Sequence, residues 1–167
     1  MTLNHGFAPV FDERSRLLIL GSFPSVKSRE EQFYYAHPRN RFWPVLAAVF
    51  DSEVPRTVEE KTAFLHRFGI ALYDVIESCS IVGSSDSSIA DVVPADLSAI
   101  VSGTEIGDRI FTNGATAFRL YRRYCYPSLG LQATLLPSSS PANAAWSLTA
   151  LTERWTSLLA PAIERSC

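Results

Sequence analysis

The sequence predicts an α/β fold, a three-layer α/β/α sandwich with a central four-stranded parallel sheet. Four short apolar runs without alternation begin near residues 17, 70, 109 and 132, as expected for strands that are covered on both faces. Stretches with helical periodicity lie between the runs, and this alternation implies right-handed crossovers and a parallel sheet. A chain of 167 residues can bury one such core, so we expect a single domain over residues 1–167.

The first strand of the predicted sheet is the run Leu17–Leu20. Residues 1–15 show no periodic pattern and are predicted to be an irregular lead-in. A long polar loop follows the strand, and Pro38 delays the next helix because proline disfavours helical backbone in the residue before it. The spacing of apolar residues then predicts a helix over residues 42–50.

A second helix and a second strand come next. Thr57 and Glu60 have the spacing of a capping box, and Gly69 is a suitable helix C-terminus. Ile70–Ile76 is the second predicted strand. The serine-rich segment 79–94 is too polar for a core element, and we predict a long loop there that is either functional or poorly ordered.

The second half of the chain supplies the other two strands. Residues 95–102 are predicted to form a short helix and Arg109–Asn113 the third strand, after which Gly114 opens another helix. The fourth strand, Gln132–Leu136, is followed by a serine–proline loop and a closing helix over residues 142–163. Because parallel strands end at one edge, the loops that follow them should converge on one rim, where α/β proteins place binding sites.

Composition argues against several classes of protein. The net charge of −2 and the pI of about 5.9 disfavour avid coating of nucleic acid, which depends on neutralised phosphates. No apolar run is long enough to span a bilayer and no secretory signal is visible, so we expect a cytoplasmic protein without membrane contact. The three cysteines are scattered without a CxxC pair, which predicts reduced thiols and neither a metal nor another cofactor.

The predicted rim loops carry serine, asparagine, histidine, aromatic and arginine side chains rather than paired carboxylates. The motifs of dinucleotide-binding proteins, P-loop proteins, zinc proteases and α/β-hydrolases are absent from the sequence. Such side chains can position a water molecule, stabilise charge and hold a planar ligand. Lys27, Arg39 and Arg41 form a local basic strip in or beside the first loop.

Three ordered segments resemble those of a known family. GSFPS at 21–25, YYAHPRNRFW at 34–43 and LPSSSPANA at 136–144 are similar to motifs of the uracil-DNA glycosylase superfamily. ALYDVIESC, GSSDSSI and FTNG fit its family six, the hypoxanthine-DNA or DNA-deoxyinosine glycosylases, in the same order. AHP-x-NRFW is also similar to the mismatch-specific uracil/thymine-DNA glycosylases. The resemblance covers about residues 16–145.

The resemblance implies a monofunctional DNA glycosylase of base excision repair. Such an enzyme flips a deaminated base out of DNA and hydrolyses its N-glycosidic bond, which is unreachable inside a duplex. Hypoxanthine is the expected base, with uracil or xanthine as further candidates, and a uracil or mismatch-specific glycosylase is the alternative. The expected partner is double- or single-stranded DNA that contains such a base, bound by a monomer without a cofactor.

Residue roles follow from the resemblance where the motifs match. Ser22 stands where most superfamily members have Asn or Asp, so the catalytic asparagine is assigned to HPRN, as Asn40, with His37 as a second catalytic candidate. Tyr35 matches the aromatic residue that stacks on the flipped base. The residues expected to bind substrate are Gly21, Ser22, Phe23, Pro24, Ser25, Tyr35 and Asn113. Those expected to bind DNA are Lys27, Arg39, Arg41, Ser138, Ser139, Ser140, Pro141 and Asn143, with Pro141 or Asn143 as the wedge.

Several residues have a second, structural interpretation. Asn40 could be a simple helix cap, and a histidine before proline, such as His37, more often makes a structural hydrogen bond. One of the adjacent residues Tyr34 and Tyr35 should lie in the core. Asp74 is expected to cap or turn the chain rather than touch substrate.

Two other functions stay open at this point. A serine hydrolase could combine Ser22 and His37 with Asp74 or Asp86, because such triads are defined by geometry. A catalytically silent nucleic-acid-binding module could keep the same pocket. Substitution of Asn40 separates them, since the hydrolase should tolerate it and the binding module should retain its affinity for DNA.

Overall fold

The computed structural model describes residues 2–80 and 88–164 and is built on a four-stranded sheet. The strands lie in the order β3-β2-β6-β7, and every neighbouring pair is parallel. They are β2 (Leu17–Gly21), β3 (Ile70–Asp74), β6 (Ile110–Asn113) and β7 (Ala133–Leu136). The predicted α/β class with a central four-stranded parallel sheet is confirmed.

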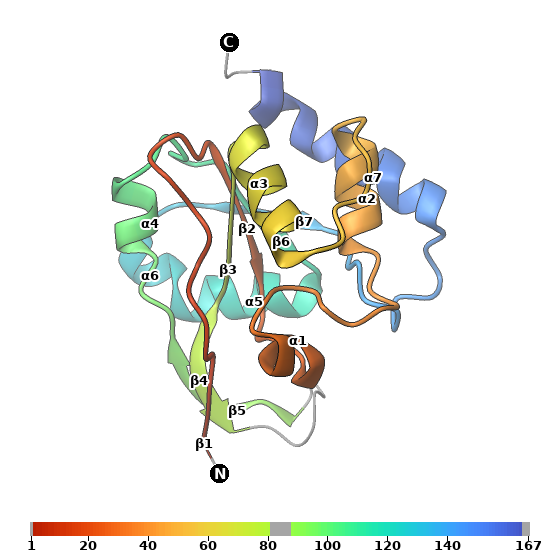
Figure 1. Cartoon of the computed structure of the whole chain (residues 1–167). Coiled ribbons are helices and arrows are strands. Elements are labelled where there is room, and N and C mark those ends of the chain that lie inside the picture. The colour runs from red at the N-terminus through yellow and green to blue at the C-terminus, as the bar shows by residue number, and fades with distance from the viewer. Residues whose placement is uncertain (1, 81–87, 165–167) are drawn as a thin grey trace.

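Helices cover both faces of this sheet and produce three layers (Figure 1). On one side α2 (Phe42–Val49) packs against α7 (Leu148–Glu164), and α3 (Val58–Phe68) lies beside β3. On the other side are α4 (Ser98–Ser102), α5 (Ala115–Tyr124) and α6 (Tyr126–Leu129). Every residue of β2 is buried, because this strand is central and covered on both faces.

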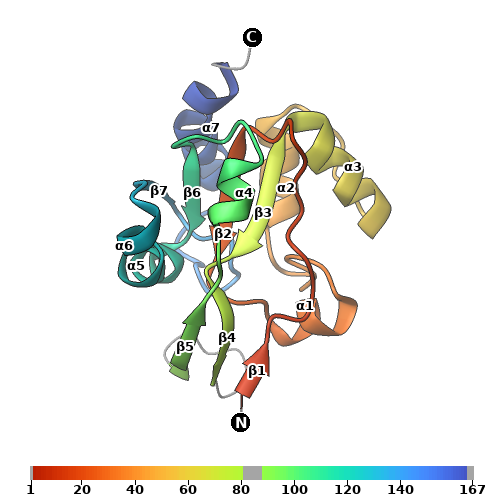
Figure 2. The ribbon, with the colours of Figure 1, turned by 90° about the vertical axis from the view of Figure 1, so that its left-hand side faces the viewer.

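A second sheet, which the sequence analysis did not predict, lies beyond the carboxyl end of β3 (Figure 2). It contains β1 (Thr2–Asn4), β4 (Ile76–Ser80) and β5 (Ala90–Pro94), paired antiparallel in the order β1-β4-β5. The predictions of an irregular lead-in and of a loop throughout 79–94 are therefore wrong where these strands form. The reason is that β5 is largely exposed and needs no apolar pattern. Residues 81–87 of that predicted loop, including Asp86, lie outside the described residues.

One short helix was not predicted, and two predicted boundaries also differ from the structure. A short helix, α1 (Val26–Glu31), interrupts the loop after β2, and Ser25 caps it by accepting a hydrogen bond from the Ser28 backbone N–H at 3.2 Å. The second strand of the main sheet ends at Asp74 rather than Ile76, because Ile76 already belongs to β4 and pairs with Pro94 in the second sheet. α7 begins at Leu148 rather than residue 142, since turns occupy the intervening residues.

The local signals of α3 are confirmed in detail. The Thr57 hydroxyl accepts from the Glu60 N–H at 3.0 Å, and the Glu60 carboxylate accepts from the Thr57 N–H at 3.3 Å. Gly69 ends the helix with a φ of 69°, in the left-handed region that glycine adopts without penalty.

The described cysteines, Cys79 and Cys125, are free and buried. Burial raises the pKa of the Cys125 thiol to about 11, so this group stays protonated at neutral pH. Cys167 lies outside the described residues. Within the residues that the structure describes, no helix is long and apolar enough to cross a membrane.

Candidate active site

The loops after the four parallel strands converge on one cavity of about 460 Å³, as the topology predicted. β2 contributes Gly21, β3 contributes Asp74 and β6 contributes Asn113, each at its carboxyl end. The loop after β7 and the segment between α1 and α2 complete the lining. A parallel sheet therefore brings together residues that lie far apart in the sequence.

Most of the predicted site residues lie around this cavity. Those that line it are Gly21, Ser22, Phe23, Pro24, Ser25, Lys27, Tyr35, His37, Asn40, Asn113, Ser138, Ser139, Ser140 and Pro141. Arg39, Arg41 and Asn143 are not among the lining residues. Asp74 is, although the sequence analysis had assigned it only to a turn.

Gly21, at the carboxyl end of β2, permits two polar side chains to approach its backbone closely. A Cβ atom at this position would lie 2.4 Å from Oδ1 of Asp74 and 3.0 Å from the hydroxyl of Tyr35. Both side chains line the cavity, so the absence of a side chain at Gly21 allows them to meet there.

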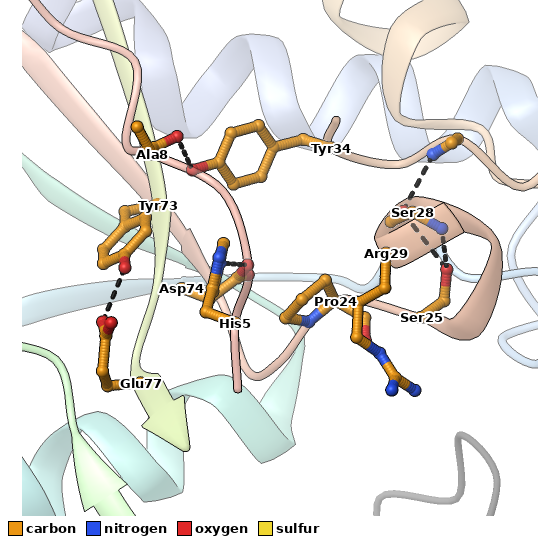
Figure 3. A network of polar contacts seen from close by, with 11 residues as sticks. His5, Ala8, Pro24, Ser25, Ser28, Arg29, Tyr34, Tyr73, Asp74 and Glu77 are labelled. Carbon is orange, nitrogen blue, oxygen red and sulfur yellow. Dashed lines mark hydrogen bonds and ion pairs between the residues drawn. The ribbon is translucent and has the colours of Figure 1, made fainter. Parts of the chain in front are cut away.

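The tyrosine pair divides as expected. Tyr34 is 2% exposed, and its hydroxyl donates to the carbonyl of Ala8 at 2.8 Å (Figure 3), so this residue belongs to the core. Tyr35 is less buried than Tyr34, which also lines the cavity, and the Tyr35 ring stacks on Phe42 with centroids 4.0 Å apart and planes 17° apart. Its backbone is left-handed, with a φ of 53°, a strain that is common at ligand sites.

The hydroxyl of Tyr35 is buried and has no hydrogen-bond partner among the described residues. Desolvation raises the pKa of this group, the charge of Asp74 adds to the effect, and the Asn113 side chain partly offsets it. Tyr35 is therefore neutral at physiological pH and can donate a hydrogen bond to a ligand.

The side chain of Asn40 connects the YYAHPRNRFW segment to the LPSSSPANA segment. Its Oδ1 accepts from the Phe42 N–H at 2.9 Å and from the Ser139 hydroxyl at 2.8 Å. Ser139 in turn accepts from Nδ2 of Asn113 at 2.9 Å, and its backbone N–H donates to Oδ1 of Asn113 at 2.9 Å. Asn40 thus lines the cavity and also binds the N–H of the first residue of α2, although it lies one position before the helix N-cap, Arg41.

His37 stabilises the turn that presents Asn40. Its Nδ1 accepts from the backbone N–H of Arg39 at 3.1 Å, and its carbonyl accepts from the N–H of Asn40 at 3.0 Å. The structural hydrogen bond expected for a histidine before proline is present. A catalytic role of His37 stays a prediction.

The basic residues of the first loop have different surroundings. The guanidinium of Arg41 donates to the backbone carbonyls of Trp146, Ser140 and Asn143, so it holds the loop after β7 in place. Lys27 forms an ion pair with Glu31 at 3.2 Å, with both side chains nearly half exposed. Arg39 is exposed, and its phosphate-binding role stays a prediction.

The two wedge candidates also differ. Nδ2 of Asn143 donates to the carbonyl of Ser138 at 3.0 Å, so its side chain is used inside the loop. Pro141 lines the cavity and is exposed, which leaves it as the residue at the surface of this loop.

Sequence reasoning missed His5, which contacts the lining residue Asp74, and it also missed four residues that line the cavity, namely Val26, Ser28, Glu30 and Tyr34. Nε2 of His5 lies 2.7 Å from Oδ2 of Asp74, and the two residues are 1% and 4% exposed (Figure 3). The ring lies among aromatic side chains, with centroids 4.5 Å from those of both Phe7 and Tyr73. No local signal marks His5, because only the pairing of β1 with β4 brings it to the end of β3.

Replacement of His5 by alanine is expected to destabilise the protein by roughly 3–5 kcal/mol, because it leaves the buried carboxylate of Asp74 without its partner. Urea unfolding measures the loss. The matched control is His66→Ala, since His66 pairs with Asp12 at 3.0 Å where both side chains are about one-third exposed. The control should cost about 0–1 kcal/mol. Equal losses of unfolding free energy in the two variants would show that burial does not make the His5–Asp74 pair more important for stability than the exposed pair.

The fold and the site define a class of protein, a three-layer α/β/α protein with a polar and aromatic cavity at the carboxyl edge of its parallel sheet. Within the described residues, no three His, Cys, Asp or Glu side chains gather in a way that could hold a metal ion. The cavity is lined by the rings of Phe23 and Tyr35 and the amides of Asn40 and Asn113, together with serines and charged side chains, which suits a planar ligand with polar edges.

Comparisons with known proteins identify the family. The model of the uracil DNA glycosylase superfamily matches residues 8–159. A hypoxanthine DNA glycosylase of Methanosarcina acetivorans is 34% identical over 142 residues, which cover 84% of this chain and 89% of that protein. Another, of Methanosarcina barkeri, is 36% identical over 87 residues, which cover 52% of this chain and 55% of that protein.

A solved structure agrees with these matches. The solution NMR structure of a candidate uracil DNA glycosylase from Methanosarcina acetivorans superposes with a TM-score of 0.74 at 32% identity, covering 95% of this chain and 99% of that one. The chain belongs to the uracil DNA glycosylase superfamily, which confirms the resemblance seen in its motifs. It is accordingly a DNA glycosylase, an enzyme whose substrate is DNA.

Proposed function

We propose that this enzyme removes hypoxanthine from DNA by hydrolysis of the N-glycosidic bond, as the first step of base excision repair. The observation that carries the proposal is the position of Asn40, whose amide lines the cavity beside Tyr35 and is tied to Ser139 of the late motif. The two hypoxanthine DNA glycosylases that match this chain support the choice of base.

The flipped base stacks on the ring of Tyr35, whose other face is supported by Phe42. Asp74 lies next to the flipped base in this proposal, with its carboxylate packed against the backbone of Gly21. A carboxylate accepts the N–H that hypoxanthine carries at N1 and uracil at N3, whereas adenine has no hydrogen at N1. This contact selects deaminated bases over adenine.

The chemistry is the addition of water to the sugar. The water oxygen bonds to C1′, the bond from C1′ to the base nitrogen breaks, and one proton of the water ends on the base. Negative charge develops on the departing base, so preorganised donors around it lower the barrier. The Tyr35 hydroxyl, the Asn40 amide and the backbone of the turn at 22–25 are the donors nearest this position.

DNA lies across the rim of the cavity in this proposal. Arg39 contacts a backbone phosphate together with the partly exposed Ser138 and Ser140, and Pro141 fills the space that the flipped base leaves. We propose that the enzyme acts as a monomer in the cytoplasm. The free buried thiols of Cys79 and Cys125 fit a reducing compartment.

The serine-hydrolase alternative has little support in the geometry. Asp74 is bonded to His5 rather than His37, and the Nδ1 atom of His37 accepts from the Arg39 backbone. A hydrolase triad would need the His37 ring between Ser22 and a carboxylate. The binding-module alternative is tested by the experiment that follows.

The test uses end-labelled oligonucleotides with one deoxyinosine, deoxyuridine or deoxyxanthosine, single-stranded and paired, and an undamaged control. After incubation, hot alkali cleaves each abasic site and a gel resolves the products. We expect cleavage at deoxyinosine and none of the undamaged strand. Cleavage at deoxyuridine alone would overturn the choice of base but keep the enzyme class. DNA binding without any cleavage would favour the binding module.

A further inference from the structure

The orientation of the Asn40 side-chain amide is fixed by its neighbours. The Phe42 N–H lies 2.9 Å from Oδ1, and a backbone N–H can only donate. If the amide were turned over, Nδ2 would face this N–H and two donors would oppose each other. The oxygen of Asn40 therefore points to α2 and the Ser139 hydroxyl, and its nitrogen points away from them.

A second backbone N–H fixes the other end of the chain of hydrogen bonds. The Ser139 N–H donates to Oδ1 of Asn113 at 2.9 Å, so the Asn113 nitrogen is the atom that faces the Ser139 hydroxyl at 2.9 Å. That hydroxyl has one hydrogen, and because it accepts from Asn113 it gives this hydrogen to Asn40 at 2.8 Å. Ser139 is 0% exposed, so water does not compete for these contacts.

Both acceptor sites of the Asn40 oxygen are thus occupied before any substrate arrives. What remains for the cavity is Nδ2, which makes no hydrogen bond within the described part of the chain. We infer that Asn40 serves the reaction as a hydrogen-bond donor and not as an acceptor, and that Ser139 and Asn113 are positioning residues that set this polarity. This inference rests on the proposed function and names how its central residue acts.

The polarity has a chemical consequence. An N–H donor stabilises the negative charge that develops on the departing base, and it holds the attacking water by the water's oxygen. It does not accept the proton of that water. Asn40 is then a catalytic residue by virtue of its donor, and the hydroxyl of Ser139 acts only through it.

Asn40→Asp is the decisive variant, because aspartate has the same shape and keeps an oxygen for both the Phe42 and Ser139 contacts but has no N–H. We expect kcat for deoxyinosine to fall about 10²–10³-fold. Thermal unfolding close to that of the wild type would show that the fold is kept. An Asn40→Asp enzyme as active as the wild type, or more active, would overturn the inference, since an acceptor would then suffice.

Ser139→Ala and Asn113→Asp test the positioning role. Asn113→Asp keeps the acceptor for the Ser139 N–H but draws the Ser139 hydroxyl hydrogen to itself, so both variants deprive Asn40 of the same donor. Each should lower kcat about tenfold with KM little changed, and the double variant should lose no more than either one. In the Asn40→Asp background Ser139→Ala should have no further effect. If the double variant lost kcat by the product of the two single losses, the two residues would have a merely structural role, which would contradict the inference.

The control for these variants is Ser15→Ala, which removes another buried serine hydroxyl, 1% exposed, that accepts from the Asp12 N–H at 2.9 Å away from the cavity. Its kcat should equal that of the wild type. A readout without turnover separates this inference from the proposed function. In NMR spectra of the free enzyme, the Asn40 Nδ2 hydrogens should show exchange with water and no strong NOE to the Phe42 amide hydrogen. A strong NOE would show the reversed amide and overturn the inference, whichever base is released.

Discussion

Hypoxanthine release is expected to fall by about 10²–10³-fold when Asn40 is replaced by alanine. The substitution removes the only amide that joins α2, the cavity and the Ser139 loop among the described residues. It also leaves the Ser139 hydroxyl and the Phe42 N–H without their acceptor, at a cost of about 1–3 kcal/mol to folding stability. The rate is measured under single-turnover conditions, in which enzyme exceeds the labelled deoxyinosine strand.

Two controls make the Asn40→Ala result interpretable. Asn4→Ala truncates an exposed asparagine of β1 outside the cavity and should leave the rate unchanged. A melting curve of Asn40→Ala shows the folded fraction at the assay temperature. If the folded variant retained a rate within about tenfold of the wild type, less than one such donor is worth, Asn40 would be a helix cap and the catalytic assignment would be wrong.

The Gly21→Ala substitution, which adds a methyl group, is expected to abolish detectable excision of hypoxanthine. The added Cβ would lie 2.4 Å from Oδ1 of Asp74 and 3.0 Å from the Tyr35 hydroxyl. Neither neighbour can move freely, because Asp74 is held by His5 and the Tyr35 ring stacks on Phe42. The two side chains that form the base pocket must therefore separate, and stacking and base selection are lost together.

Gly21→Ala also lowers stability, since overpacking in a buried site costs about 1–3 kcal/mol. Equilibrium binding of deoxyinosine DNA, measured by fluorescence anisotropy alongside cleavage, separates loss of the pocket from loss of the fold. Gly107→Ala is the matched control, because a Cβ there meets nothing within 4 Å, although its φ of 58° carries some strain. Normal excision by Gly21→Ala would show that Asp74 and Tyr35 do not hold the base.

Sequence patterns determined the parallel sheet because its signal is local. A strand covered on both faces must be apolar at every position, and β2 shows this in five successive buried residues. The convergence of its loops then follows from topology alone, since parallel strands end at the same edge. Residues at the carboxyl ends of strands, such as Gly21 and Asn113, could therefore be assigned to one site without a structure.

The second sheet had no such signal. β5 is exposed along most of its length and is held by pairing with β4, so its side chains show no apolar alternation. β1 is three residues long and depends on β4 in the same way. These strands exist because of hydrogen bonds between distant segments, which a local pattern does not record.

The sequence by itself determined the class of fold, the edge of the sheet that carries the site and most of the residues around the cavity. The tertiary structure alone decided how those residues act. It brought His5 to Asp74 across 69 positions of the chain, turned the Arg41 guanidinium to the loop after β7, and fixed which atom of Asn40 faces the cavity. The physical reason is that a residue's type sets the hydrogen bonds it can make, while only its neighbours in space determine which ones it does make.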